Sequence, residues 1–258
     1  FTSLGYDRAD PDTILSLRIH GVTPDDVAEM NRLFGRRSLD EHVAFQIHGV
    51  TPEFVQRMTA LGLGKVGPDD ALAFAIHGVD SSFVEALRSA GYERLSADEV
   101  VAARIHGVRP DDLDEWKKLG YPRPSLEELV AARIHGVDAE FAAEIRSEGL
   151  SNVSLEDLVG FRIHGVSAEF LREMKSLGVA LSGDDATAFR VHGVTSELVR
   201  AVQALGYSNL ETDDLISLRV HGVSVARIRD ANARAGRRLP LDEVIEERIY
   251  GKDDEDEE

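Results

Sequence analysis

The chain has 258 residues, of which 43% are hydrophobic and 29% are charged, a composition that argues against wholesale disorder. Its formal charge of −18 repels phosphate backbones and anionic lipid, so nucleic acid is disfavoured as a partner. The absence of cysteine excludes disulfides, thiolate nucleophiles and cysteine zinc sites, and no apolar run reaches the roughly 18–20 residues that span a bilayer.

A short motif recurs from one end of the chain to the other. Ile-His-Gly-Val or Val-His-Gly-Val occurs eight times at steps of 28 or 29 residues, and an altered ninth copy reads Ile249-Tyr250-Gly251-Lys252. Such a fixed period predicts a repeat architecture. The residues that we assign to the structural turn of each repeat are His20, Gly21, His48, Gly49, His77, Gly78, His106, Gly107, His135, Gly136, His164, Gly165, His192, Gly193, His221 and Gly222.

The first half of each repeat predicts a helix that ends at the Ile-His-Gly-Val or Val-His-Gly-Val motif. In the fifth repeat, Ser125 and Glu128 have the spacing of a capping box. An apolar stripe at helical spacing follows, formed by Leu126, Leu129, Val130 and Ile134. We expect Gly136 to end this helix in the left-handed conformation, with Val137 packing back on the last turn.

The second half of each repeat predicts another helix. Asp138 is expected to cap it, Phe141 and Ile145 to form its buried stripe, and Gly149 to stop it. Capping-box pairs at other first helices are Ser38 with Glu41, Ser96 with Glu99, and Ser154 with Asp157.

Two short helices cannot bury their apolar stripes alone, but stacked neighbours can. The sequence therefore predicts an all-α fold, an α-solenoid of about nine stacked two-helix repeats that forms a single array over residues 1–251. Residues 252–258 are a run of like charges, which predicts a disordered acidic tail.

The predicted array starts and ends in mid-repeat. Residues 1–5 are expected to be the end of a second helix, and residues 241–250 a first helix without a second one after it. Because Phe1 is not an initiator methionine, we expect a mature product or a piece of a longer protein. The complementary half-repeats also suggest an alternative function, head-to-tail self-association into filaments.

The eight motif histidines suggest a metal site, but their geometry argues against one. Equivalent positions in packed helices lie about 8–10 Å apart, whereas ligand nitrogens lie about 2 Å from a shared ion. We therefore expect no metal and no cofactor, and assign the histidines to the helix ends, where a ring N–H can bond a free carbonyl. Weak metal binding or pH sensing is the alternative.

Arginine recurs two residues before the histidine in most repeats. We take Arg104, Arg133, Arg162 and Arg190 as candidate binding residues that could hold carboxylates of an acidic peptide. The alternative is a structural row that compensates helix C-termini and pairs with acids of neighbouring repeats. The acids at the helix starts could in turn recruit a basic partner, although capping explains them first.

The turn Gly21-Val22-Thr23 with its flanking helices resembles the helix-hairpin-helix family. In that family, backbone N–H groups beside a second glycine hold a DNA phosphate. Here that glycine is replaced in every repeat, by Thr23, Thr51, Asp80, Arg109, Asp138, Ser167, Thr195 and Ser224. The resemblance thus implies the hairpin geometry, while nucleic-acid binding is only a further alternative.

Over residues 1–251 the chain also resembles the IHGVTPEF-type repeats in C-terminal regions of some bacterial membrane proteins, among them metallopeptidases similar to beta-lactam sensors. That resemblance implies a sensor or interaction appendage outside the cytoplasm, in the periplasm or the extracellular space. The peptidase motif His-Glu-x-x-His does not occur in this chain. Neither do the nucleophile-elbow, phosphate-loop or dinucleotide motifs, so we expect no enzyme but a scaffold that binds a protein or peptide without inserting into a membrane.

Overall fold

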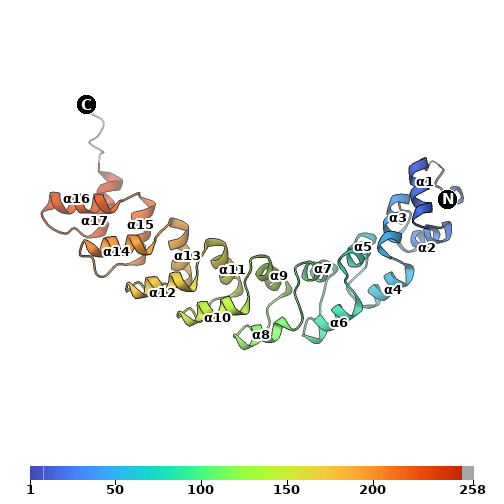
Figure 1. Ribbon diagram of the computed structural model, residues 1–258, viewed down its shortest axis with the longest axis horizontal. Coiled ribbons are helices and arrows are strands. Elements are labelled where there is room, and N and C mark those ends of the chain that lie inside the picture. The colour runs from blue at the N-terminus through green and yellow to red at the C-terminus, as the bar shows by residue number, and fades with distance from the viewer. Residues whose placement is uncertain (8, 252–258) are drawn as a thin grey trace, which may run out of the picture. The chain divides into compact units, whose positions relative to one another are not determined.

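The computed structural model describes residues 1–7 and 9–251 (Figure 1). Over these residues the protein is all-helical, with seventeen α-helices, one 3-10 turn, η1 (Thr2–Leu4), and no strand. Successive helices pack against one another in a solenoid-like repeat arrangement, which confirms the predicted fold class. The predicted acidic tail, residues 252–258, lies outside the described residues.

Each repeat contributes a first and a second helix. The first helices are α1 (Pro11–Ile19), α3 (Leu39–His48), α5 (Pro68–His77), α7 (Ala97–Ile105), α9 (Leu126–Ile134), α11 (Leu155–His164), α13 (Gly183–His192), α15 (Thr212–Val220) and α17 (Leu241–Tyr250). The second helices are α2 (Pro24–Phe34), α4 (Pro52–Ala60), α6 (Ser81–Ser89), α8 (Asp112–Lys118), α10 (Ala139–Ser147), α12 (Ala168–Ser176), α14 (Ser196–Ala204) and α16 (Val225–Ala235).

Local capping sets where these helices begin. At α3, the backbone N–H of Ser38 donates to the Glu41 carboxylate (2.9 Å) while the Glu41 N–H donates to the Ser38 hydroxyl (3.2 Å). The same reciprocal box starts α7, α11 and α13, so two of the unpaired N–H groups at each of these helix ends are satisfied. The capping boxes expected from the sequence are confirmed.

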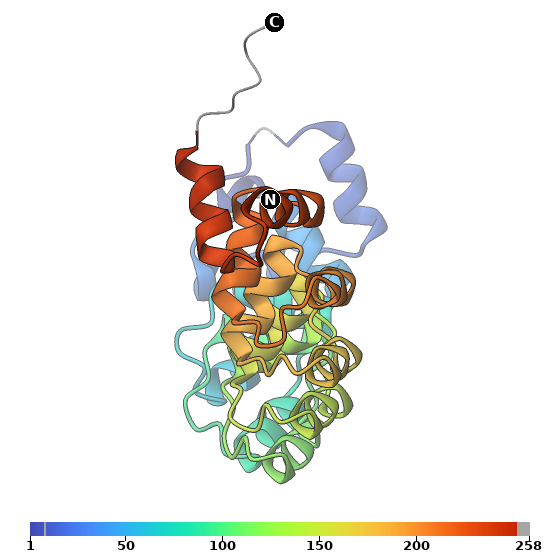
Figure 2. The ribbon, with the colours of Figure 1, turned by 90° about the vertical axis from the view of Figure 1, so that its left-hand side faces the viewer.

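The chain divides into two compact units, unit 1 (Phe1–Arg133) and unit 2, which begins at Ile134. In unit 1, the first helices α1, α3, α5 and α7 each pack on the next one, and in unit 2 the same holds for α11, α13, α15 and α17. The second helices of unit 2, α10, α12, α14 and α16, form a parallel second layer (Figures 1 and 2). The extent of the array as a single domain stays a prediction.

The core of unit 2 lies between these two layers. Leu158 and Phe161 of α11 and Met174 of α12 are at most 1% exposed. Each repeat buries its own stripe and those of its neighbours, as the sequence requires of helices too short to be stable alone.

The ends of the described chain match the expectation in part. Residues 2–4 form a single 3-10 turn instead of an α-helical tail, and Gly5 ends it in the left-handed conformation (φ 86°). At the other end, α17 covers the predicted first helix. No helix in the described part of the chain is long and apolar enough to span a membrane.

Candidate binding surface

The recurring motif forms the predicted turn between first and second helix. At the end of α11, Gly165 adopts φ +77°, and the backbone N–H of Val166 donates to the carbonyl of Phe161 (2.8 Å). This is the bonding pattern of a Schellman stop, in which backbone groups satisfy the free carbonyls. The eight turn glycines, which are Gly21, Gly49, Gly78, Gly107, Gly136, Gly165, Gly193 and Gly222, all have positive φ.

The motif histidines do not make the expected ring hydrogen bonds. All eight side chains are exposed, and within the described residues none of their rings donates to a helix-end carbonyl. The reason is that backbone N–H groups of the following glycine and valine already donate to those carbonyls. The N–H of Gly193, for example, donates to the carbonyl of Arg190, and the N–H of Val194 donates to that of Phe189. The described residues include no group of three or more His, Asp or Glu side chains arranged to hold a metal ion.

The candidate arginines of unit 1 reach back to the preceding repeat. The Arg104 guanidinium lies 4.8 Å from the ring centroid of Phe83, and its Nε donates to the carbonyl of Gly78 (3.1 Å). The Arg133 guanidinium donates to the Asp112 carboxylate, which is buried at the start of α8. Both arginines therefore bridge two repeats while their side chains remain partly exposed.

The candidate arginines of unit 2 occupy equivalent places. Arg162 lies 3.8 Å from the ring centroid of Phe141, and Arg190 lies 5.1 Å from that of Phe170. Both rings belong to the first turn of the preceding second helix and are at most 7% exposed. A cation above a buried ring stabilises this contact between neighbouring repeats.

A second row, which the sequence did not single out as a surface, is the aliphatic residue between each arginine and histidine. In unit 1 it comprises Ile19, Ile47, Ile76 and Ile105, which are 48–68% exposed. In unit 2 it includes Ile163, Val191, Val220 and Ile249, which are 42–57% exposed. We call these residues the aliphatic row.

The prediction that Ile134 belongs to the apolar stripe of α9 with Leu126 and Leu129 was wrong. Ile134 is 53% exposed, whereas Leu126, Leu129 and Ala132 are at most 3% exposed. At about 100° per residue, Ile134 lies about 140° around the helix from Leu129 and about 160° from Ala132. The buried stripe runs at a three-residue spacing, which leaves the aliphatic position before histidine on the outside.

Three first helices of unit 2, α11, α13 and α15, present the same outward face. In α11, Ile163 shares a face with Gly160, three residues earlier, and Glu156, seven residues earlier. Glu156 is exposed and Gly160 is half-buried. In α13 the same positions hold Val191, Ala188 and Asp184, and in α15 they hold Val220, Ser217 and Asp213. The face is thus a low apolar band with a carboxylate at the N-terminal end of each helix.

We call the exposed carboxylates at the N-terminal ends of α11, α13, α15 and α17 the carboxylate edge. Glu156, Asp184, Asp213 and Asp242 are exposed, and none takes part in an ion pair among the described residues. Beside them, burial together with the charges of Glu211, Asp242 and Asp213 raises the pKa of Asp214. Negative charge is therefore crowded at this edge of unit 2.

The positions that replace the second helix-hairpin-helix glycine are helix caps. The Ser167 hydroxyl accepts the N–H of Phe170 (3.2 Å), and the Asp138 carboxylate accepts that of Phe141 (2.8 Å). A backbone N–H group that already donates a hydrogen bond to a capping side chain is not free to bind a phosphate. The exception is Arg109, which precedes the N-cap Asp111 of α8 and whose backbone N–H donates to the Asp112 carboxylate (3.0 Å).

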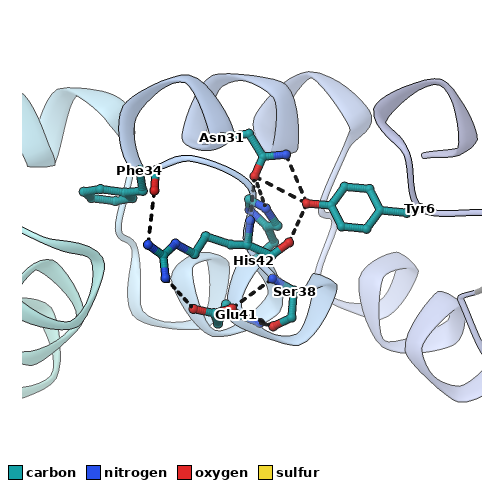
Figure 3. Close-up of polar contacts among 7 residues, drawn as sticks. Tyr6, Asn31, Phe34, Ser38, Glu41 and His42 are labelled. Atoms are coloured by element: carbon teal, nitrogen blue, oxygen red, sulfur yellow. Dashed lines mark hydrogen bonds and ion pairs between the residues drawn. The ribbon is translucent and has the colours of Figure 1, made fainter.

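Unit 1 also contains a partly buried polar cluster at its first repeats (Figure 3). The Asn31 amide donates to the Tyr6 hydroxyl (3.0 Å), which donates to the carbonyl of Arg37. His42 Nε2 lies 3.2 Å from Asn31 Oδ1, and burial lowers the pKa of His42 despite the nearby Glu41 charge. The cluster joins consecutive repeats and accounts for Tyr6 as a packing residue.

One open cleft of about 700 Å³ lies next to this cluster. Asp10, Arg36 and Asp40 are among its lining residues. Asp10 is engaged as the cap of α1, and the Arg36 guanidinium donates to the carbonyl of Gly5. These groups serve the fold, and their arrangement suggests no particular reaction.

No protein-family model matches the sequence. A search of curated proteins also found no significant match.

Proposed function

We propose that the chain is a non-catalytic scaffold that binds a protein or peptide along the outward face of its first helices. The observation that carries this proposal is the aliphatic row, because one large aliphatic side chain per repeat is about half exposed to solvent. Single exposed aliphatic residues are common on protein surfaces, but an exposed aliphatic residue that recurs at the same place on packed neighbouring helices is consistent with an interaction site.

The row has no evident role in the fold. The hydrophobic contact of each helix stop is made by the buried valine after glycine, such as Val166, which is 2% exposed. Ile163 is 57% exposed and is not needed for that contact. An unneeded aliphatic residue at the same place in neighbouring repeats supports a binding role, because the solvated face of a helix is ordinarily polar.

We assign the arginine row a supporting part in this surface. Arg104, Arg133, Arg162 and Arg190 hold neighbouring repeats together through their contacts with the preceding repeat. They also border the aliphatic row, so they remain candidate contacts for a partner. The bacterial origin, the location outside the cytoplasm and the role as a sensor appendage, which follow from the resemblance alone, belong to the same proposal.

A random peptide library displayed on phage tests the scaffold function without a known partner. We expect selected peptides to bind the protein and to lose at least tenfold in affinity when Ile163, Val191 and Val220 are replaced by serine. The matched control replaces exposed alanines of the second helices by serine, at Ala143, Ala204 and Ala233. The proposal fails if no peptide is enriched, or if both triple variants, shown to be folded by circular dichroism, bind the peptides equally.

A further inference from the structure

The charges that flank the aliphatic row differ in how far they are already engaged. On α11, Arg162 is about 100° around the helix from Ile163 and lies over Phe141 of the preceding repeat. Glu156 is only about 20° from Ile163, so its carboxylate faces outward on the same side. A partner that meets the aliphatic row thus approaches the carboxylate edge of unit 2, while Arg162 and Arg190 lie over rings of the preceding repeat.

This arrangement repeats through four adjacent first helices of unit 2. The carboxylate precedes the aliphatic residue by seven positions in α11, α13, α15 and α17. Seven residues of helix correspond to about 10 Å, which is close to the width of one helix with its side chains. The carboxylate edge and the aliphatic row are therefore far enough apart to contact two sides of a single bound helix.

The spacing of the repeats also fits a helical occupant. Packed helices lie about 8–10 Å apart, and residues seven apart on a bound helix lie about 10 Å apart. An extended strand places residues on one face about 7 or 13 Å apart, so it would fall out of register. A helix lying across α11, α13, α15 and α17 can present one aliphatic side chain to each of them.

From these observations we propose that the surface of unit 2 binds a basic amphipathic helix of a partner protein, with aliphatic side chains on the aliphatic row and Lys or Arg side chains along the carboxylate edge. This inference rests on the proposed scaffold function and gives the partner's chemistry. The small residues Gly160, Ala188 and Ser217 between the two rows leave room for the partner's side chains to approach the backbone of α11, α13 and α15. The crowding of like charges around Asp214 is a repulsion that bound cations would relieve.

Designed peptides test this chemistry directly. The probe is a labelled 21-residue helical peptide with leucines along one face and lysines beside them. A second peptide carries glutamate in place of every lysine, and a third has the composition of the probe in scrambled order. In anisotropy titrations at physiological salt, we expect the basic amphipathic peptide to bind at least tenfold more tightly than either of the others.

Two sets of variants separate location from net charge. Replacing Glu156, Asp184 and Asp213 by Gln or Asn should weaken binding of the basic peptide at least fivefold. The matched control replaces Glu140, Glu169 and Glu197 by Gln, which changes the net charge equally at exposed positions of the second helices. Equal weakening by both sets, or tight binding of the scrambled peptide, would mean general attraction to an acidic protein and would overturn the inference.

The outcomes also separate this inference from the scaffold function. If the acidic peptide binds more tightly, and that binding is lost in the variant with serine at Ile163, Val191 and Val220, the inference is wrong but the scaffold function stands. If sedimentation shows that the protein dimerises through the aliphatic row and binds no peptide, a second copy is the occupant and the inference is overturned.

Discussion

Asp112 is the buried carboxylate at the start of α8, and its replacement by asparagine should destabilise that repeat by about 2 kcal/mol. Its side chain is 5% exposed and accepts from Arg109 Nε (3.0 Å) and from Arg133. A hydrogen bond to a charged group contributes about 1.5–3 kcal/mol, but the pair with Arg109, which is 70% exposed, adds under about 1 kcal/mol. Arg133 is 39% exposed, so its contribution is discounted as well.

The single tryptophan of the chain makes this measurement local. Trp116 lies in α8 and is 5% exposed, so its fluorescence during urea denaturation reports the unfolding of this repeat. The matched control is Asp114→Asn, which removes a carboxylate that is 77% exposed and pairs with Lys117 at 3.3 Å. That control should cost less than about 0.5 kcal/mol.

The pH dependence gives the Asp112 prediction a second check. Burial alone would raise the pKa of Asp112, but the hydrogen bonds from Arg133 and Arg109 outweigh it and lower the pKa below 3.8. A carboxyl with a lowered folded pKa stabilises the fold above its unfolded pKa, and that contribution is lost as the pH falls through the folded value. The difference between wild type and Asp112→Asn should therefore be full at pH 7 and should shrink below about pH 4. Equal effects of the two asparagine variants at pH 7 would refute the reasoning.

Three further predictions address the turn, the exposed row and the buried histidine. Gly165→Ala should cost about 1–2 kcal/mol because φ is +77°, whereas Gly160→Ala, within α11, should stabilise by about 0.5–1 kcal/mol. A stabilising Gly165→Ala or a destabilising Gly160→Ala in urea denaturation would contradict this. Phe161→Ala should cost about 3–5 kcal/mol and Ile163→Ala less than about 0.5 kcal/mol, so similar costs would show that the row is part of the core. Since burial lowers the pKa of His42 from 6.5, the unfolded chain binds more protons, and the unfolding free energy should fall as the pH drops below 6.5; an unchanged slope in His42→Gln would disprove this.

The features that the sequence predicted well are those with local causes. Ser38 and Glu41 form their capping box because both partners lie within one helical turn, and Gly165 takes a conformation that side chains disfavour. Because the sequence repeats every 28 or 29 residues, a prediction made for one repeat applies at the equivalent positions of the others. Helix order, helix ends and fold class followed from these signals.

The features that the sequence missed depend on how neighbouring repeats rotate and meet. Ile134 was assigned to the buried stripe of α9, because an apolar residue at helical spacing looks the same whether or not a neighbour covers it. The contact between Arg109, Asp112 and Arg133 joins two repeats, and no signal within one repeat indicates it. The aliphatic row could have been found by noting that its residues lie far around the helix from the strongest apolar positions.

The side-chain bonds between neighbouring repeats have a consequence for how the chain reaches its fold. They join residues whose separation along the sequence is short and nearly constant, such as 26 positions for Arg104 and Gly78 and 32 for Tyr92 and Pro124. The entropy lost in closing each such loop is then similar in every repeat and does not grow with chain length. Folding should therefore be fast for a chain of this size, and removing a whole repeat between equivalent positions should leave the folding rate almost unchanged.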